Sequence, residues 1–167
     1  MPDALVKSFA PVFSKDSRVL VLGSYPSPKS FAQNFYYGHP QNRFWPLMAA
    51  LTGFDTPQTV LQKCALILNS GLALWDSLES CTITGASDAS IRDPVPNNIA
   101  SLLALTKVRH IFCNGSAAHK FYHQFNEAAT GIAAVRLPST SPANAAFSLP
   151  RLLNAWQPLA DALKTRP

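Results

Sequence analysis

The fold is decided by a short apolar run that stops at a glycine, Arg18-Val19-Leu20-Val21-Leu22-Gly23. Valine and leucine follow one another here without polar alternation, which is the pattern of a strand buried on both faces. Residues 24–43 then contain prolines, serines, aromatics, an amide and a histidine before helical periodicity returns. A loop of that length without its own periodicity favours a functional segment over a simple connector. We therefore expect a ligand pocket directly after this strand.

Further apolar runs predict strands, and helical patterns separate them. Strands are expected at residues 18–22, 65–68, 110–113 and 132–137. Helices are expected at residues 44–51, 57–64, 98–106, 116–126 and 148–164, with residues 4–13 as a short helix or apolar arm. Apolar strands that alternate with helices predict a parallel sheet covered on both faces. The predicted fold is α/β, a three-layer α/β/α arrangement around a short, mainly parallel four-stranded sheet.

Small polar residues follow the predicted strands, at residues 23–27, 69–71, 114–115 and 139–144. Ligands of open α/β sheets bind outside the carboxyl ends of the strands. These four segments are therefore expected to converge on one side of the sheet.

Composition narrows the class of protein. The 47% of apolar residues in 167 is usual for a folded domain, and no apolar run reaches the ~20 residues that cross a bilayer. The first residues lack the layout of a signal peptide, so a cytoplasmic protein with no membrane association is expected. The net charge of +5 permits a polyanionic partner, but the basic residues are scattered.

The cysteines give no sign of a metal site. Cys64, Cys81 and Cys113 are three in number and widely spaced, which fits neither a disulfide framework nor paired metal ligands. We expect no metal and no cofactor.

The aromatic part of the long loop is a candidate pocket wall. Phe35-Tyr36-Tyr37 precedes Gly38-His39-Pro40, which argues against a buried helix and favours a surface on which a base can stack. His39 is a candidate acid, base or phosphate contact, or else a structural residue. Asn42 either caps the following helix or presents its amide to a base or a water molecule.

Two hydroxyl-containing segments complete the motifs. Gly23-Ser24-Tyr25-Pro26-Ser27 matches no established anion-binding loop, and alone it is an ordinary turn. Ser139-Thr140-Ser141-Pro142-Ala143-Asn144 offers hydroxyls and main-chain N–H groups to phosphate, or it is a plain solvent loop. It lacks the elbow of a nucleophilic serine.

In this order, the two hydroxyl segments and the intervening Tyr36–Trp45 element resemble the uracil-DNA glycosylase superfamily. The chain looks most like its hypoxanthine-DNA (deoxyinosine) glycosylase branch, and the Gly38–Trp45 element also resembles mismatch-specific uracil/thymine-DNA glycosylases. The resemblance covers nearly the whole chain and implies a single DNA glycosylase domain over residues 1–167. It implies cleavage of the N-glycosidic bond of a damaged base flipped out of DNA.

The resemblance also implies roles for individual residues. Tyr25 stands where the family usually has an acid or amide that positions water, and a phenol with an ordinary pKa near 10 cannot replace that base at neutral pH. The implied catalytic residues are Ser24, Tyr25, Asn42 and Ser139, the last at the position of a stabilising histidine. The implied base-binding residues are Tyr36, Tyr37, His39 and Asn69, with Tyr37 stacking on the base and Asn69 reading it. The implied DNA-binding residues are Ser27, Ser141, Pro142, Ala143 and Asn144, within a loop that wedges into the minor groove.

The expected function is that of a monofunctional DNA glycosylase of deaminated bases in base excision repair, with hypoxanthine ahead of uracil and xanthine. The expected partner is double-stranded DNA with a deaminated base, bound by a monomer, and the use of single-stranded DNA stays open. One alternative is a nucleic-acid-binding relative without catalysis. The other is a hydrolase of nucleosides or nucleotides.

Overall fold

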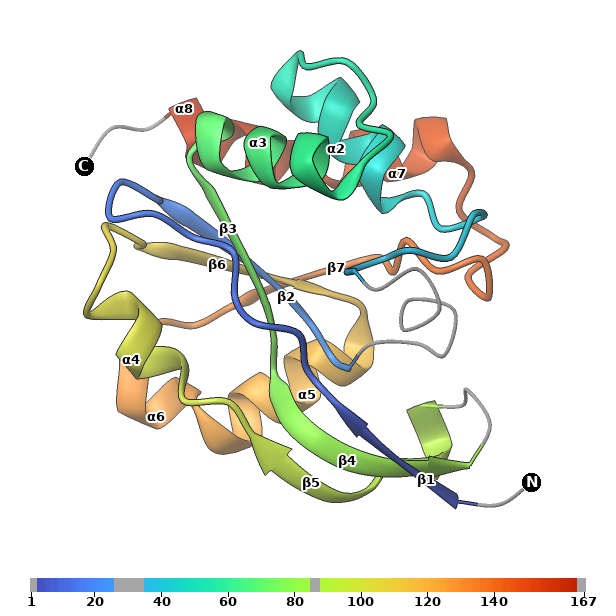
Figure 1. The fold of residues 1–167 in the computed structure, drawn as a ribbon, viewed down its shortest axis with the longest axis vertical. Coiled ribbons are helices and arrows are strands. Elements are labelled where there is room, and N and C mark those ends of the chain that lie inside the picture. The colour runs from blue at the N-terminus through green and yellow to red at the C-terminus, as the bar shows by residue number, and fades with distance from the viewer. Residues whose placement is uncertain (1–2, 26–34, 85–87, 165–167) are drawn as a thin grey trace.

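The computed structural model describes residues 3–25, 35–84 and 88–164 (Figure 1). A four-stranded sheet lies at its centre, made of β2 (Val19–Gly23), β3 (Leu72–Asp76), β6 (His110–Asn114) and β7 (Val135–Leu137). The strand order is β3-β2-β6-β7, and every neighbouring pair is parallel. This confirms the predicted parallel sheet.

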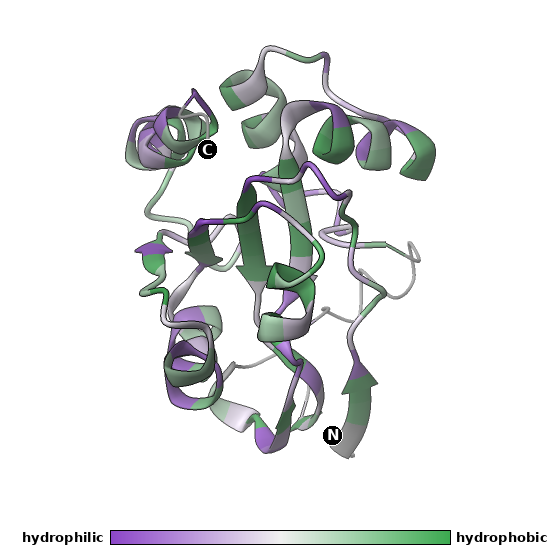
Figure 2. Ribbon diagram, turned by 90° about the vertical axis from the view of Figure 1, so that its left-hand side faces the viewer, coloured by the Kyte–Doolittle hydropathy of each residue, from purple (hydrophilic) through white to green (hydrophobic). Residues whose placement is uncertain are grey.

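Helices cover both faces of the sheet, as predicted (Figure 1). One face is covered by α2 (Phe44–Thr52), α3 (Val60–Ser70), α7 (Leu149–Ala155) and α8 (Gln157–Lys164). The other face is covered by α4 (Ile99–Leu103), α5 (Ser116–Phe125) and the short α6 (Glu127–Thr130). Side chains of β2 alternate between the two cores, so that Val19 and Val21 face the α2 side while Leu20 and Leu22 face the α5 side. Figure 2 shows the strongly hydrophobic strands between these layers.

A second, antiparallel sheet was not predicted. It contains β1 (Asp3–Lys7), β4 (Leu78–Thr84) and β5 (Arg92–Pro96), in the order β1-β4-β5, with the 3-10 turn Asp88–Ser90 between the last two. The expected helix in residues 4–13 is therefore wrong, although the apolar arm continues to Val12, which bridges to Leu74. The polar residues 81–96, which gave no strand pattern, form most of β4 and all of β5.

The predicted helix at residues 57–64 is present from Val60, but the predicted strand at 65–68 is wrong, because these residues continue the same helix, α3. The helix begins after Thr59, whose side chain forms a capping box with Gln62, and it ends at Gly71 with φ 86°. A short apolar run cannot be distinguished from a buried helical segment by its pattern alone. The second strand of the parallel sheet is therefore β3.

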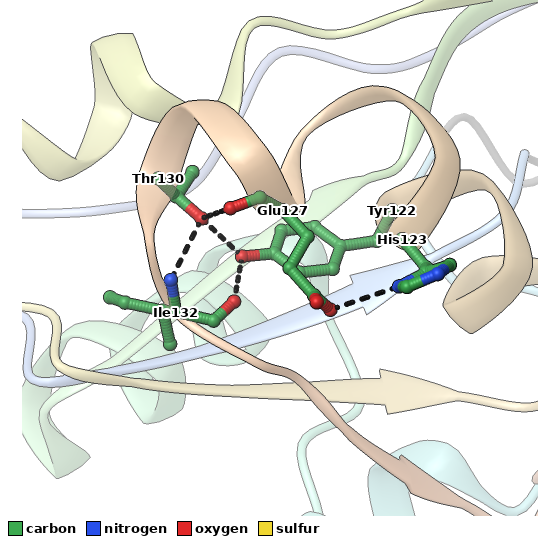
Figure 3. Close-up of polar contacts among 5 residues, drawn as sticks. All are labelled: Tyr122, His123, Glu127, Thr130 and Ile132. Carbon is green, nitrogen blue, oxygen red and sulfur yellow. Dashed lines mark hydrogen bonds and ion pairs between the residues drawn. The ribbon is translucent and has the colours of Figure 1, made fainter.

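The end of the chain differs in detail from the prediction. The last helix is divided at Trp156 into α7 and α8, and β7 is shorter than the expected strand at residues 132–137. Ile132, the first residue of the expected strand, is bound to α5 instead. The Tyr122 hydroxyl of α5 donates to the Ile132 carbonyl at 2.6 Å and lies 2.5 Å from Thr130 Oγ1 (Figure 3). No helix in the described part of the chain has the length and hydropathy for crossing a membrane.

Candidate active site at the carboxyl end of the sheet

The carboxyl ends of three adjacent strands place three residues on the α2 side of the sheet. Gly23 of β2 is in register with Asp76 of β3, and Asn114 ends β6 on the other side of β2. Residues 23–25, 114–115 and 139–144 therefore meet here, as predicted. Residues 69–71 do not, because they precede β3 and lie at the opposite end of the sheet.

Asn69 was expected to end a strand and read the base, and this placement is wrong. Asn69 is an exposed residue in the last turn of α3. The polar residue that ends the second strand is Asp76. Sequence reasoning missed Asp76 because the apolar run at residues 65–68 was taken for the strand. The available signal was a polar residue closing the apolar run Leu72-Ala73-Leu74-Trp75.

Asp76 is a buried carboxyl group, with its side chain only 2% exposed. The Ser8 hydroxyl donates to Asp76 Oδ2 at 3.1 Å, while the Asn97 amide donates to the Asp76 main-chain carbonyl at 2.9 Å. Burial raises the pKa of Asp76 to about 7, because the ionised form loses its hydration, and the Ser8 hydrogen bond offsets this only in part. A substantial fraction of Asp76 is therefore protonated at neutral pH.

Gly23 leaves space that Asp76 and Tyr37 fill. A Cβ atom on Gly23 would lie 2.5 Å from Asp76 Oδ1 and 2.8 Å from the Tyr37 hydroxyl. The Tyr37 hydroxyl is buried and has no partner in hydrogen-bonding geometry among the described residues; Asn114, whose side chain is bonded to Thr140, lies near it. Burial, and secondarily the Asp76 carboxyl, raise the pKa of Tyr37, so its phenol is neutral.

Tyr37 presents an aromatic surface to the site. Its ring stacks on Phe44 at a centroid distance of 4.0 Å and an interplanar angle of 24°. Its backbone has φ 53°, a left-handed conformation that costs a non-glycine residue about 1–3 kcal/mol. Tyr37 is only partly buried. One face of the Tyr37 ring therefore lies on Phe44, and its stacking on a base stays a prediction.

Tyr36, by contrast, is a core residue. It is 2% exposed, and its hydroxyl is 2.9 Å from both the Phe9 and the Ala10 carbonyls. The Trp45 indole N–H donates to the Tyr36 carbonyl at 3.0 Å. The predicted base contact of Tyr36 is contradicted by this burial, because its ring and its hydroxyl are both used in packing the N-terminal arm.

Asn42 lies in a chain of hydrogen bonds that joins the two predicted motif loops. Its Oδ1 accepts from the Phe44 main-chain N–H at 2.9 Å and from the Thr140 hydroxyl at 2.8 Å. Asn114 Nδ2 donates to Thr140 Oγ1, and Asn114 Oδ1 accepts from the Thr140 main-chain N–H, both at 3.0 Å. Asn42 thus caps the start of α2 with its oxygen while its nitrogen is left for other contacts. Asn114 and Thr140 were not among the predicted site residues.

The Arg43 side chain holds the loop at residues 139–147 through hydrogen bonds to main-chain carbonyls of the loop. The guanidinium donates to the carbonyls of Thr140 at 3.3 Å, Ser141 at 2.7 Å and Asn144 at 3.2 Å, and also to that of Phe147. Because these acceptors are neutral carbonyls, they do not offset the positive charge of Arg43, which forms no ion pair within residues 3–25, 35–84 and 88–164. A loop with such a charge attracts phosphate. Sequence reasoning gave Arg43 no role.

The hydroxyls and amide of this loop mainly order the loop itself. Ser139 Oγ accepts from the Ser141 main-chain N–H at 3.1 Å, and Ser141 Oγ accepts from that of Ala143 at 3.2 Å. The Asn144 amide donates to the Ser139 carbonyl at 3.0 Å. Pro142 is partly buried and Ala143 is exposed. The loop therefore has a defined shape that is suited to contact with another surface.

The other predicted residues have different surroundings. The Ser24 carbonyl accepts from the Leu78 main-chain N–H at 3.2 Å, and the Tyr25 ring packs on the apolar cluster of β4 and α5. His39 Nδ1 accepts from the Gln41 main-chain N–H at 3.0 Å, which stabilises the turn before Asn42. Ser27 lies outside the described residues. Within the described ranges, no group of three or more His, Cys, Asp or Glu side chains is arranged to hold a metal ion.

Comparisons with known proteins identify the family of this chain and proteins of similar sequence and fold. Residues 10–160 match the family model of the uracil DNA glycosylase superfamily. A hypoxanthine DNA glycosylase from Methanosarcina acetivorans is 31% identical over 144 residues, covering 85% of this chain and 90% of the relative. One from Methanosarcina barkeri is 28% identical over 117 residues, covering 69% and 74%. A solution NMR structure from Methanosarcina acetivorans, provisionally described as a uracil DNA glycosylase, superposes with a TM-score of 0.84 at 29% identity, covering 97% of this chain and all of the other.

Proposed function

Because this chain belongs to the uracil DNA glycosylase superfamily, we propose that it is a monofunctional DNA glycosylase whose first substrate is hypoxanthine. It then hydrolyses the N-glycosidic bond of deoxyinosine in double-stranded DNA, with uracil and xanthine as weaker substrates. The observation that carries this proposal is the Asn42 amide, held by the Phe44 main-chain N–H and the Thr140 hydroxyl next to the residue on whose ring Tyr37 stacks. The relatives named hypoxanthine DNA glycosylase support the same choice of base.

The polar groups of the site suit the departure of a purine. Breaking the glycosidic bond leaves negative charge on the base and oxocarbenium character on the sugar, so preorganised donors at the base lower the barrier. The Asn42 amide is such a donor, and the Tyr37 ring supplies a stacking surface of about 1–3 kcal/mol per base. Flipping costs least for a weakly paired base, which includes hypoxanthine.

The residue at position 25 supports hypoxanthine over uracil. The family usually has an acid or amide there to position water, and Tyr25 instead packs against apolar side chains of β4 and α5. A site without that group depends more on stabilising the departing base than on activating water. The uncompensated charge of Arg43 at the adjacent loop favours DNA over a free nucleoside as the substrate.

A base-release panel tests the proposal. Duplexes containing one deoxyinosine, deoxyuridine or deoxyxanthosine are incubated with excess protein, and abasic sites are then cleaved with alkali. Strand cleavage is expected first at deoxyinosine and is expected to slow strongly, to a measurable residual rate, in Asn42→Ala, with Asn98→Ala as a control that changes a helix cap of α4 away from the site.

Two results would contradict it. Salt-sensitive DNA binding without release of any deaminated base would indicate a non-catalytic DNA-binding relative. Faster turnover of free inosine than of deoxyinosine in DNA would indicate a nucleoside hydrolase.

A further inference from the structure

We propose that Thr140 is a positioning residue that fixes the orientation of the Asn42 amide, so that Asn42 offers only hydrogen-bond donors to the substrate. The inference rests on the proposed function for its kinetic consequence, but the orientation itself follows from the hydrogen bonds in the protein. Thr140 is fully buried, between the loop at residues 139–147 and the start of α2.

The first anchor is the main-chain N–H of Thr140, which can only donate. It is 3.0 Å from Asn114 Oδ1, and this contact identifies that atom of the Asn114 side chain as its oxygen. The Asn114 nitrogen therefore faces Thr140 Oγ1, at 3.0 Å, and donates to it. Since the Thr140 hydroxyl accepts from Asn114, its single proton is available for the remaining neighbour, Asn42.

The second anchor is the main-chain N–H of Phe44, which also can only donate. It is 2.9 Å from Asn42 Oδ1, so this contact independently places the Asn42 oxygen toward α2. The same oxygen accepts the Thr140 hydroxyl proton at 2.8 Å. The two anchors are the N–H groups of residues 44 and 140, which lie 96 positions apart in the sequence. Both require the same orientation of the Asn42 amide. Both acceptor positions of Oδ1 are occupied, and the two N–H groups of Asn42 remain.

This orientation assigns a chemical role to Asn42. As the C1′–N9 bond breaks, its electron pair stays on the base, and an N–H group of Asn42 can donate to the purine as that charge develops. Water adds its oxygen to C1′, and the proton it releases ends on the departed base. The Asn42 amide transfers no proton, and its saturated oxygen is not available to accept one from water. Asn42 thus acts on the leaving group.

Single-turnover base release from deoxyinosine DNA at saturating enzyme tests the positioning role. Thr140→Val keeps the side-chain shape but removes the hydroxyl, so Asn42 Oδ1 keeps only its contact with the Phe44 N–H and the amide is held less firmly; we expect the rate to fall about 10- to 100-fold with DNA affinity unchanged. Thr140→Ser restores the hydroxyl and is expected to recover most of the rate. Thr52→Val is the matched control, because Thr52 Oγ1 bonds only within α2, to the Met48 carbonyl at 2.7 Å.

A double mutant separates positioning from general stability. If Thr140 acts through Asn42, Thr140→Val causes no further loss in the Asn42→Ala background, whereas a structural role predicts multiplied losses. Full activity of Thr140→Val, or multiplied losses in the double mutant, would overturn the proposal.

A measurement without catalysis covers the case in which the protein releases no base. The Asn42 side-chain amide pair in a ¹H–¹⁵N spectrum is identified by its absence from Asn42→Ala. We expect Thr140→Val to shift this pair, Thr140→Ser to restore it and Thr52→Val to leave it in place. An unshifted pair in Thr140→Val would overturn the positioning role whatever the activity, while absent base release with a shifted pair would overturn only the proposed function.

Discussion

The buried Asp76 makes the stability of this protein depend on pH in a direction opposite to that of most carboxylates. Its pKa is raised from 3.8 to about 7 by burial. Below pH 4 both the folded and the unfolded chain hold this proton, and the contribution of Asp76 to the free energy of unfolding is at its most favourable. As the pH rises from 4 to 7 the unfolded chain loses the proton while the folded chain keeps it, so the free energy of unfolding falls by about 1.4 kcal/mol per pH unit. The total loss is about 4 kcal/mol, complete just above pH 7.

Asp76→Asn isolates this contribution, because the amide has nearly the same shape and does not titrate. Urea unfolding of both proteins is measured at several pH values between 4 and 8, and other titrating groups cancel in the difference. We expect Asp76→Asn to gain stability relative to the parent as the pH rises. Tyr36 and Tyr37, which lie near the carboxyl, stay neutral in this range because burial raises the pKa of each.

Asp16→Asn is the control of opposite sign. Asp16 lies 3.0 Å from the Lys107 ammonium, and their hydrogen bond and charge attraction lower its pKa. A constant difference between Asp76→Asn and the parent over pH 4–7 would show that Asp76 ionises normally, and the argument from burial would then be refuted.

Two further substitutions test the packing of the site. Gly23→Ala places a methyl group 2.5 Å from Asp76 Oδ1 and 2.8 Å from the Tyr37 hydroxyl, so we expect a loss of about 1–3 kcal/mol in urea unfolding and slower base release. Arg43→Met removes the charge that holds the loop at residues 139–147. Fluorescence anisotropy with deoxyinosine DNA is expected to show weaker binding and a slope of log K against log salt reduced by about one; an unchanged slope would show that Arg43 does not act on phosphate.

The central sheet could be predicted because its strands are buried on both faces. The runs at β2 and β6 contain almost only apolar residues and end at a small residue, Gly23 or Asn114, and such runs have few other uses. The apolar run at residues 65–68 has the same composition, but the Thr59 capping box and Gly71 make it part of a helix. That distinction depends on helix ends, which a short apolar pattern does not contain.

The sequence predicts those parts of the candidate site that lie in short motifs. Asn42 and Tyr37 lie in a distinctive local sequence, and both are found near the carboxyl end of the sheet, while their roles stay predictions. Asp76 and Thr140 depend instead on strand register and on contacts between distant segments: Gly23 meets Asp76 because two strands pair in register, and Asn42 meets Thr140 across 98 positions. Tyr36 was assigned to the pocket because sequence adjacency does not show which of two neighbouring aromatic rings is buried.

The grip of Arg43 on main-chain carbonyls has a consequence for how this loop can vary. Carbonyl groups are common to every amino acid, so the loop keeps its shape whichever side chains it carries at Ala143, Ala145 and Ala146. These exposed positions, which we propose to face the DNA, can then exchange side chains without disturbing Asn42, which precedes Arg43 directly. Recognition of the surrounding duplex and removal of the base can therefore be altered separately, and libraries randomised at these three alanines offer a route to glycosylases with new preferences for strand or opposite base.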